Sequence, residues 1–79
     1  MKEIRGKNDN GEYTEYQINK HRSVVVQRRF GDRIWFIYDS MRGVKGKIRT
    51  AGHDVKRSRA EQQAKAYIQG LKNAGTVVR

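Results

Sequence analysis

The chain has 79 residues and no cysteine. This length excludes two folded domains, because one domain typically needs on the order of 100 residues, and the missing cysteine excludes a disulfide, a thiolate metal cluster and a cysteine nucleophile. Lys and Arg number 18 against 8 Asp and Glu, a net charge of +10 that attracts polyanions. Solubility alone needs less charge, so we expect nucleic acid as the partner.

The apolar content predicts a thin core. Only 35% of the residues are hydrophobic, with one Trp, two Phe and four Tyr, which leaves little to line a deep substrate pocket. We therefore expect neither an enzyme nor a cofactor. No apolar run approaches the roughly 18 residues of a membrane span, and no apolar stretch follows residues 1–5 as in a secretory signal. These patterns indicate a soluble cytoplasmic protein, associated with the nucleoid if it binds DNA.

The positive charge is unevenly distributed along the chain. Residues 1–15 hold three basic and four acidic side chains, a net of −1, so the remaining 64 residues carry +11. Residues 1–12 show no hydrophobic periodicity and predict a flexible arm, followed by a single nucleic-acid-binding domain over residues 13–79. An extended segment, which we expect at the edge of the sheet, is favoured by Tyr13, Thr14, Tyr16 and Ile18.

A β-hairpin is predicted next. Two β-rich runs, Ser23 to Phe30 and Arg33 to Asp39, flank Gly31-Asp32, a pair suited to the positive φ of a tight turn. A two-residue turn places Arg28 opposite Trp35, Val26 opposite Ile37 and Val24 opposite Asp39, all on one face. The other face then carries Val25, Gln27, Arg29, Ile34, Phe36 and Tyr38.

A loop over Ser40 to Gly46 and a short third strand, Lys47-Ile48-Arg49-Thr50, follow the hairpin. In that strand Ile48 points one way while Lys47 and Arg49 point the other. Ser58-Arg59-Ala60-Glu61 matches a capping box and predicts the start of a helix that ends near Gly75. Its apolar stripe contains Ala60, Ala64, Tyr67, Ile68 and Leu71, and its outer side contains Arg59, Gln62, Lys65, Gln69 and Lys72.

The elements together predict an α+β fold, a three-stranded antiparallel sheet with a further N-terminal edge strand, packed on one C-terminal helix. One helix covers one face, and we assign the face with Val24, Val26, Trp35 and Ile37 to the core because its apolar residues cluster centrally. The open face then presents Gln27, Arg29, Phe36, Tyr38, Lys47 and Arg49, donors and rings suited to phosphates and bases. A register slip of one residue would exchange the faces, and Arg28, Arg33 and Trp35 would become the contacts.

The residues Val26 to Trp35, Tyr38-Asp39, Gly46 to Arg49 and Ala60 to Tyr67 resemble the β-β-β-α DNA-binding domain of plant ethylene-response factors. The same fold occurs in the arm-binding domains of phage and transposon integrases, which this chain also resembles in size and in the order of its elements. The resemblance covers about residues 22–72. It implies that the sheet enters the major groove and that Gln27, Arg29, Tyr38, Lys47 and Arg49 contact DNA. One position departs from the family pattern, because the plant proteins commonly have tryptophan where this chain has Arg49.

Other chemistry is not indicated by the sequence. His21 and His53 have no Cys or Glu at ligand spacing, so we expect no metal site. Residues 43–47 resemble a phosphate loop but lack the Walker spacing and lead into a strand, so here we expect Arg42 and Lys45 to contact DNA phosphates.

We therefore expect a small DNA-binding accessory protein of a phage or mobile element. The alternatives are a phage-type inhibitor that docks its basic surface on an acidic host protein, and an RNA-binding module. No membrane or small-molecule partner is expected.

Overall fold

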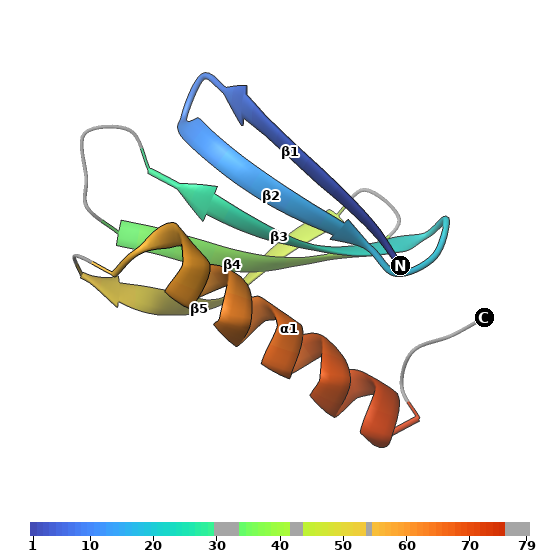
Figure 1. Ribbon diagram of the computed structural model, residues 1–79. Coiled ribbons are helices and arrows are strands. Elements are labelled where there is room, and N and C mark those ends of the chain that lie inside the picture. Colours follow the sequence, from blue (N-terminus) through green and yellow to red (C-terminus); the bar gives the residue numbers. More distant parts are fainter. Residues whose placement is uncertain (30–33, 42–43, 54, 76–79) are drawn as a thin grey trace.

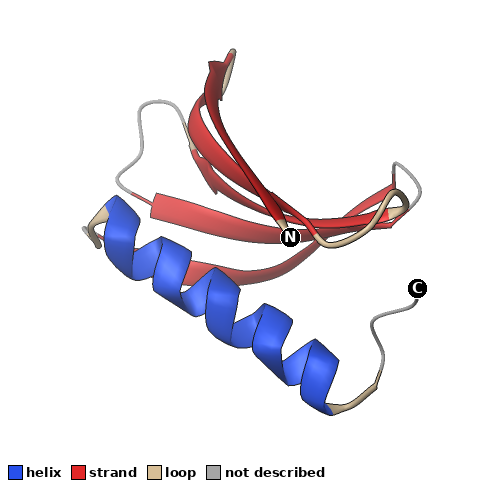
Figure 2. Cartoon of the chain, turned by 45° about the vertical axis from the view of Figure 1, so that its right-hand side comes forward, coloured by secondary structure: helices blue, strands red, loops and turns tan. Residues whose placement is uncertain are grey.

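The computed structural model describes residues 1–29, 34–41, 44–53 and 55–75, apart from the side chains of Lys45, residues 47–50 and His53. The elements in chain order are β1 (Lys2–Asn8), β2 (Gly11–Gln17), β3 (Arg22–Arg28), β4 (Ile34–Met41), β5 (Val44–His53) and α1 (Arg57–Asn73). The strands form one antiparallel sheet in the order β1-β2-β3-β4-β5, and α1 lies across one side of it (Figures 1 and 2). The predicted α+β fold is confirmed, with five strands.

The register of the β3–β4 hairpin is the predicted one. Arg28 pairs with Trp35, Val26 with Ile37 and Val24 with Asp39. The turn predicted at Gly31-Asp32 lies outside the described residues.

The helix covers the predicted face. The sheet contributes Tyr16, Val24, Val26, Trp35, Ile37 and Ala51 to the core, and α1 contributes Ala60, Ala64 and Ile68. Alanine has only a methyl group, so the helix can approach the sheet closely. No described helix lies over the opposite face, on which Val25, Gln27 and Phe36 are each only 7% exposed while Tyr38 is half-buried.

β1 differs from the expected flexible arm. Its seven residues pair with β2 in regular register, from Lys2 opposite Gln17 to Asn8 opposite Gly11. As an edge strand that is exposed or half-buried throughout, it needs no hydrophobic alternation, so the sequence carried no periodic signal for it. The polar run from Asn8 to Gly11, predicted as part of the flexible arm, is the hairpin turn. β2, predicted as the edge, is therefore an interior strand.

β5 is longer and less regular than predicted. Met41 pairs with Val44, so most of the loop expected over Ser40 to Gly46 belongs to β4 and β5. Register shifts between Trp35 and Phe36, and again between Ile37 and Tyr38, interrupt the simple alternation assumed for this strand.

The helix begins without the predicted capping box. α1 starts at Arg57, and its N-cap residue, Lys56, makes no side-chain capping hydrogen bond. Glu61 cannot reach back to Ser58, because its carboxylate is bound on the sheet side by Thr14 and Arg5. The predicted end is confirmed. Gly75 has a φ of 70° just beyond the helix, and its N–H donates to the Lys72 carbonyl.

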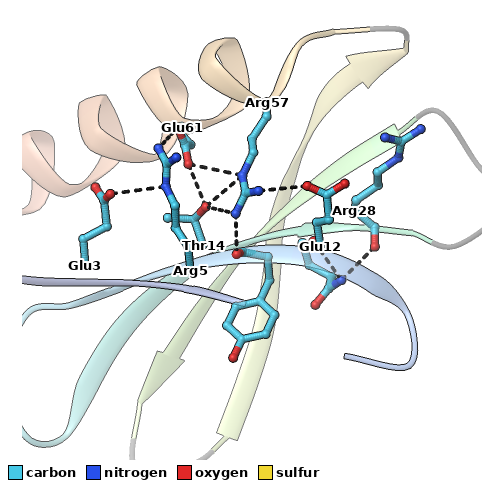
Figure 3. A network of polar contacts seen from close by, with 9 residues as sticks. Glu3, Arg5, Glu12, Thr14, Arg28, Arg57 and Glu61 are labelled. Carbon is cyan, nitrogen blue, oxygen red and sulfur yellow. Dashed lines mark hydrogen bonds and ion pairs between the residues drawn. The ribbon is translucent and has the colours of Figure 1, made fainter. Parts of the chain in front are cut away.

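A polar network joins the N-terminal hairpin to the helix (Figure 3). The Thr14 hydroxyl donates to Glu61 at 2.6 Å, and Arg5 donates to the other oxygen of that carboxylate at 3.0 Å. Arg57 donates to the Tyr13 carbonyl at 2.7 Å and to Glu12 at 2.9 Å. These contacts hold β1 and β2 against the start of α1.

Candidate nucleic-acid interface

The open face is hollowed beside the end of β3. A hollow of about 220 Å³ is lined by Asn10, Gln27, Arg29, Phe36 and Tyr38. The Phe36 and Tyr38 ring centroids are 6.3 Å apart at an interplanar angle of 37°, and the Arg29 guanidinium carbon lies 6.0 Å from the Phe36 centroid. Three of the predicted contact residues, Gln27, Arg29 and Tyr38, are therefore brought together here.

This arrangement combines a cation with two aromatic rings. The strand pairing puts Phe36 opposite Gln27, and Tyr38 is two residues further along β4 on the same face. Phe36 is buried, Tyr38 is half-buried, and Arg29 is exposed just after β3. A guanidinium held near a ring keeps its donors in a defined region, where they can meet a phosphate or a guanine edge.

The hollow continues along the open face. A second hollow of about 320 Å³ shares Gln27 with the first and is also lined by Lys7, Tyr13, Glu15 and Val25. A third, of about 230 Å³, shares Glu15 with the second and is also lined by residues of the β2–β3 connection, including Lys20. We call these three adjoining hollows the open-face groove. It runs from Arg29 at one end of the sheet to Lys20 at the other.

The Gln27 side chain makes three hydrogen bonds within the protein. Its side-chain amide donates to the carbonyls of Glu12 (3.2 Å) and Arg28 (2.7 Å) and accepts from Asn8 at 2.8 Å. The residue is only 7% exposed. These bonds occupy both amide hydrogens and hold the β1–β2 turn against β3. The DNA contact of Gln27 stays a prediction.

Of the residues proposed for inverted faces, the two that the structure describes, Arg28 and Trp35, do not line the groove. Trp35 is 4% exposed in the core beneath α1, and the Arg57 guanidinium carbon lies 5.8 Å from its ring centroid. Arg28 is exposed but pairs with Trp35, and so belongs to the helix side of the sheet. Arg33 lies outside the described residues.

The remaining predicted contacts are described only in part. Arg42 lies outside the described residues, and Lys45, Lys47 and Arg49 are described as backbone positions of β5. Lys47 pairs with Tyr38, a groove residue, whereas Arg49 pairs with Ile37, a core residue. The register shift between these pairs removes the regular alternation from which a shared face was predicted.

The N-terminal hairpin supplies groove residues that the sequence did not suggest. Asn10 lines the hollow beside Arg29, while Lys7 and Tyr13 line the next one. The available signal was the turn sequence Asn8 to Gly11, which is compatible with a hairpin. A hairpin turn at Asn8 to Gly11 pairs residues 2–8 with β2 and so places them in the sheet.

Comparisons with protein-family models, with curated proteins and with solved structures found no match to this chain. What the chain shares with the resembled DNA-binding domains is the order of an antiparallel sheet followed by one C-terminal helix packed on it. Within the described ranges, no helix is long and apolar enough to cross a membrane.

Proposed function

We propose that the protein binds duplex DNA through the open-face groove, without catalysing a reaction. The observation that carries this proposal is the placement of Arg29 over Phe36 and beside Tyr38 on the face that α1 leaves uncovered. The half-buried Tyr38 ring can pack on a sugar, a thymine methyl or an exposed base, and the exposed Arg29 guanidinium can meet phosphate or guanine, while the buried Phe36 ring supports Arg29 from below.

The net charge of the chain supports the same partner. At +10, the protein attracts a polyanion over a long range, and each neutralised phosphate releases counterions. The exposed acidic side chains of the described ranges are Glu3, Asp9 and Glu12, which all belong to the β1–β2 hairpin. The strand order places this hairpin at the β1 edge of the sheet, and a further acidic residue of the hairpin, the half-buried Glu15, lines two of the hollows of the groove.

The chain offers a matched pair of arginines as a test. Arg28 and Arg29 are adjacent and exposed, but Arg28 is on the helix side of the sheet and Arg29 lines the groove. Arg29→Glu is expected to weaken binding of a fluorescent duplex about tenfold or more, while Arg28→Glu, with the same change of net charge, changes it much less.

The salt dependence of DNA affinity distinguishes charged contacts with phosphate from contacts made by an aromatic ring. Log affinity of the wild-type protein should fall steeply with log salt between about 50 and 200 mM, and Arg29→Ala should reduce the slope by about one contact. Tyr38→Ala should weaken binding without changing the slope, because a ring contributes no counterion release.

Equal losses from the two arginine variants would contradict a groove interface. Equal affinity for an RNA duplex would favour the RNA-binding alternative. Tight, salt-insensitive capture of an acidic protein together with weak DNA binding would favour the inhibitor.

A further inference from the structure

A carboxylate lies in the middle part of the open-face groove. Glu15 lines both the second and the third hollow, between the exposed cations Arg29 and Lys20 at the two ends. Of the described residues that line the three hollows, Glu15 is the one acidic side chain. The surface proposed to bind a polyanion therefore carries a negative charge between its positive ends.

The strand pairing sets the direction of the Glu15 side chain. Glu15 lies opposite Ile4 of β1 and Val25 of β3, and Val25 in turn lies opposite Tyr38 of β4. Cross-strand partners share a face, so these four residues form one row across the open face. Tyr16, the next residue of β2, points into the core on the helix side. The Glu15 carboxylate therefore faces the groove.

The folded chain makes little use of the Glu15 charge. The carboxylate accepts one hydrogen bond, from the Gln17 side-chain amide at 3.2 Å, and it forms no ion pair with any side chain that the structure describes. By contrast, the carboxylates of Asp39 and Glu61 are each bound by an arginine. A carboxylate has about four acceptor positions. Glu15 therefore keeps acceptor positions for a partner that enters the groove.

A carboxylate at a DNA interface discriminates between base edges. It only accepts hydrogen bonds at neutral pH, so it repels phosphates and the acceptor edges of guanine and thymine. Cytosine presents its N4 amino donor in the major groove with no acceptor of its own beside it. Adenine also presents an amino donor there, but the N7 acceptor of the same base lies next to it. Cytosine is therefore the base that suits Glu15.

We infer that Glu15 accepts a hydrogen bond from the N4 amino group of a cytosine in the major groove, and so makes the open-face groove selective for that base. This role rests on the proposed function, because the groove must first hold a duplex. It divides the work of the groove, since Arg29 and Lys20 attract the duplex and Glu15 discriminates between sequences.

The Glu15 and Arg29 contacts belong to one short site on the DNA. Val25, the cross-strand partner of Glu15, is four residues from Arg29, which is about 13 Å at the spacing of a strand, and neighbouring strands are about 5 Å apart. The two backbone positions are therefore about 14 Å apart, or about four base-pair steps of 3.4 Å. The base position that depends on Glu15 should lie within about one helical turn of the position that depends on Arg29.

The test measures base preference and overall affinity separately. Duplexes bound by the wild-type protein are selected from a pool with about ten randomised positions, and affinities are then measured for the selected duplex and for each of its single-base variants. For the wild-type protein we expect one position at which cytosine is preferred about fivefold or more.

Glu15→Gln removes the charge but keeps an acceptor for Gln17. Because glutamine pairs with N6 and N7 of adenine, the preference at this position should change from cytosine to adenine. Binding to unrelated duplexes should strengthen about twofold or more, since a repulsive charge leaves the groove. Glu15→Ala should lose the cytosine preference without gaining one for adenine. Urea unfolding of each variant shows whether it is folded.

The matched control is Glu3→Gln. It makes the same change of net charge at an exposed residue that lies opposite Tyr16, on the helix side of the sheet. This variant should keep the cytosine preference. If Glu3→Gln and Glu15→Gln changed base preference alike, net charge and not position in the groove would be responsible, and the role of Glu15 would be overturned.

Different results contradict the role of Glu15 and the groove interface. A cytosine preference that survives in both Glu15 variants, a different base at the Glu15-dependent position, or duplex binding without preference at any position would overturn the role of Glu15. The groove interface would still stand if Arg29→Glu weakened binding much more than Arg28→Glu. Equal losses from these two arginine variants would overturn the groove interface, and the role of Glu15 with it.

Discussion

The hydroxyl of Tyr67 on α1 donates a 2.6 Å hydrogen bond to Asp39 on β4. The same carboxylate accepts two hydrogen bonds from Arg22, at 2.7 and 3.1 Å, so one acidic group joins β3, β4 and the helix. The Arg22 and Asp39 side chains are only 11% and 13% exposed. The Arg22 hydrogen bonds hold the pKa of Asp39 below its usual value and the Tyr67 bond adds to this, while burial opposes it.

Replacing Asp39 by Asn should lower the free energy of unfolding by about 2 kcal/mol at neutral pH, because Arg22 loses its charged partner in a largely buried setting. The folded-state pKa lies below the ordinary 3.8. The stability that the charge contributes is therefore present above pH 3.8 and is lost as the pH falls through the folded-state value. Urea unfolding of both proteins from pH 7 to strongly acidic pH should show a constant difference above pH 3.8 that shrinks as the pH falls below 3.8 towards the folded-state pKa. A difference independent of pH would contradict the assignment.

Glu61 and Glu12 both contact Arg57 and provide a comparison between a buried and an exposed carboxylate. Their side chains are 9% and 49% exposed. Glu61→Ala should cost about 2–3 kcal/mol, because the buried Thr14 hydroxyl loses its acceptor and Arg57 loses an ion-pair partner 3.5 Å away. Glu12→Ala should cost less than about 1 kcal/mol, because water solvates the exposed pair. Thermal or urea unfolding measures both, and equal losses would show that the network in Figure 3 is not centred on Glu61.

The sequence predicts β3, β4 and α1 because each of these elements buries one face in the core. Val24, Val26, Trp35 and Ile37 alternate toward the helix, and the Ala60, Ala64 and Ile68 stripe has helical spacing. Burial of one face requires such periodicity. This pattern sufficed for the hairpin register and for the choice of the buried face.

The misjudged features depend on tertiary contacts. β1 buries no face of its own, so its place in the sheet depends on pairing with β2 and on the ion pairs of Arg5. The capping motif at Ser58 is overridden because Glu61 finds stronger partners in the sheet. The position of Gln27 on the open face follows from strand alternation, whereas its three internal hydrogen-bond partners could not be inferred without the β1–β2 turn.

Tyr16 has an unsatisfied hydroxyl in the core. The residue is 0% exposed, and no hydrogen-bond partner of its hydroxyl is found in the described part of the chain. Burial, followed by the nearby charge of Glu61, raises the pKa of Tyr16 to about 12. Tyr16→Phe removes a buried polar atom that makes no bond and should leave stability unchanged or raise it by about 1 kcal/mol. A loss above about 1 kcal/mol in urea unfolding would show that the hydroxyl has a partner.

Gly11 and Gly70 should respond to alanine in opposite directions. Gly11 starts β2 with a φ of 131°, and a Cβ there would lie 3.0 Å from the Arg28 backbone oxygen. Gly11→Ala should therefore cost about 1–3 kcal/mol through strain and close contact. Gly70 is exposed inside α1, where an added Cβ meets nothing within 4 Å, so Gly70→Ala should stabilise by about 0.5–1 kcal/mol.

Hydrogen exchange separates the local from the global effect of the Gly11 change. Because Gly11 closes the β1–β2 hairpin and Asn8 is its cross-strand partner, amide protection in Lys2–Asn8 should fall more than protection in β3 and β4. If Gly11→Ala were neutral, or if protection fell equally in all strands, the left-handed backbone at Gly11 would not be what fixes this hairpin. The hairpin also supplies Asn10 to the groove, so DNA affinity of Gly11→Ala should fall with it, whereas Gly70→Ala should bind as the wild-type protein does.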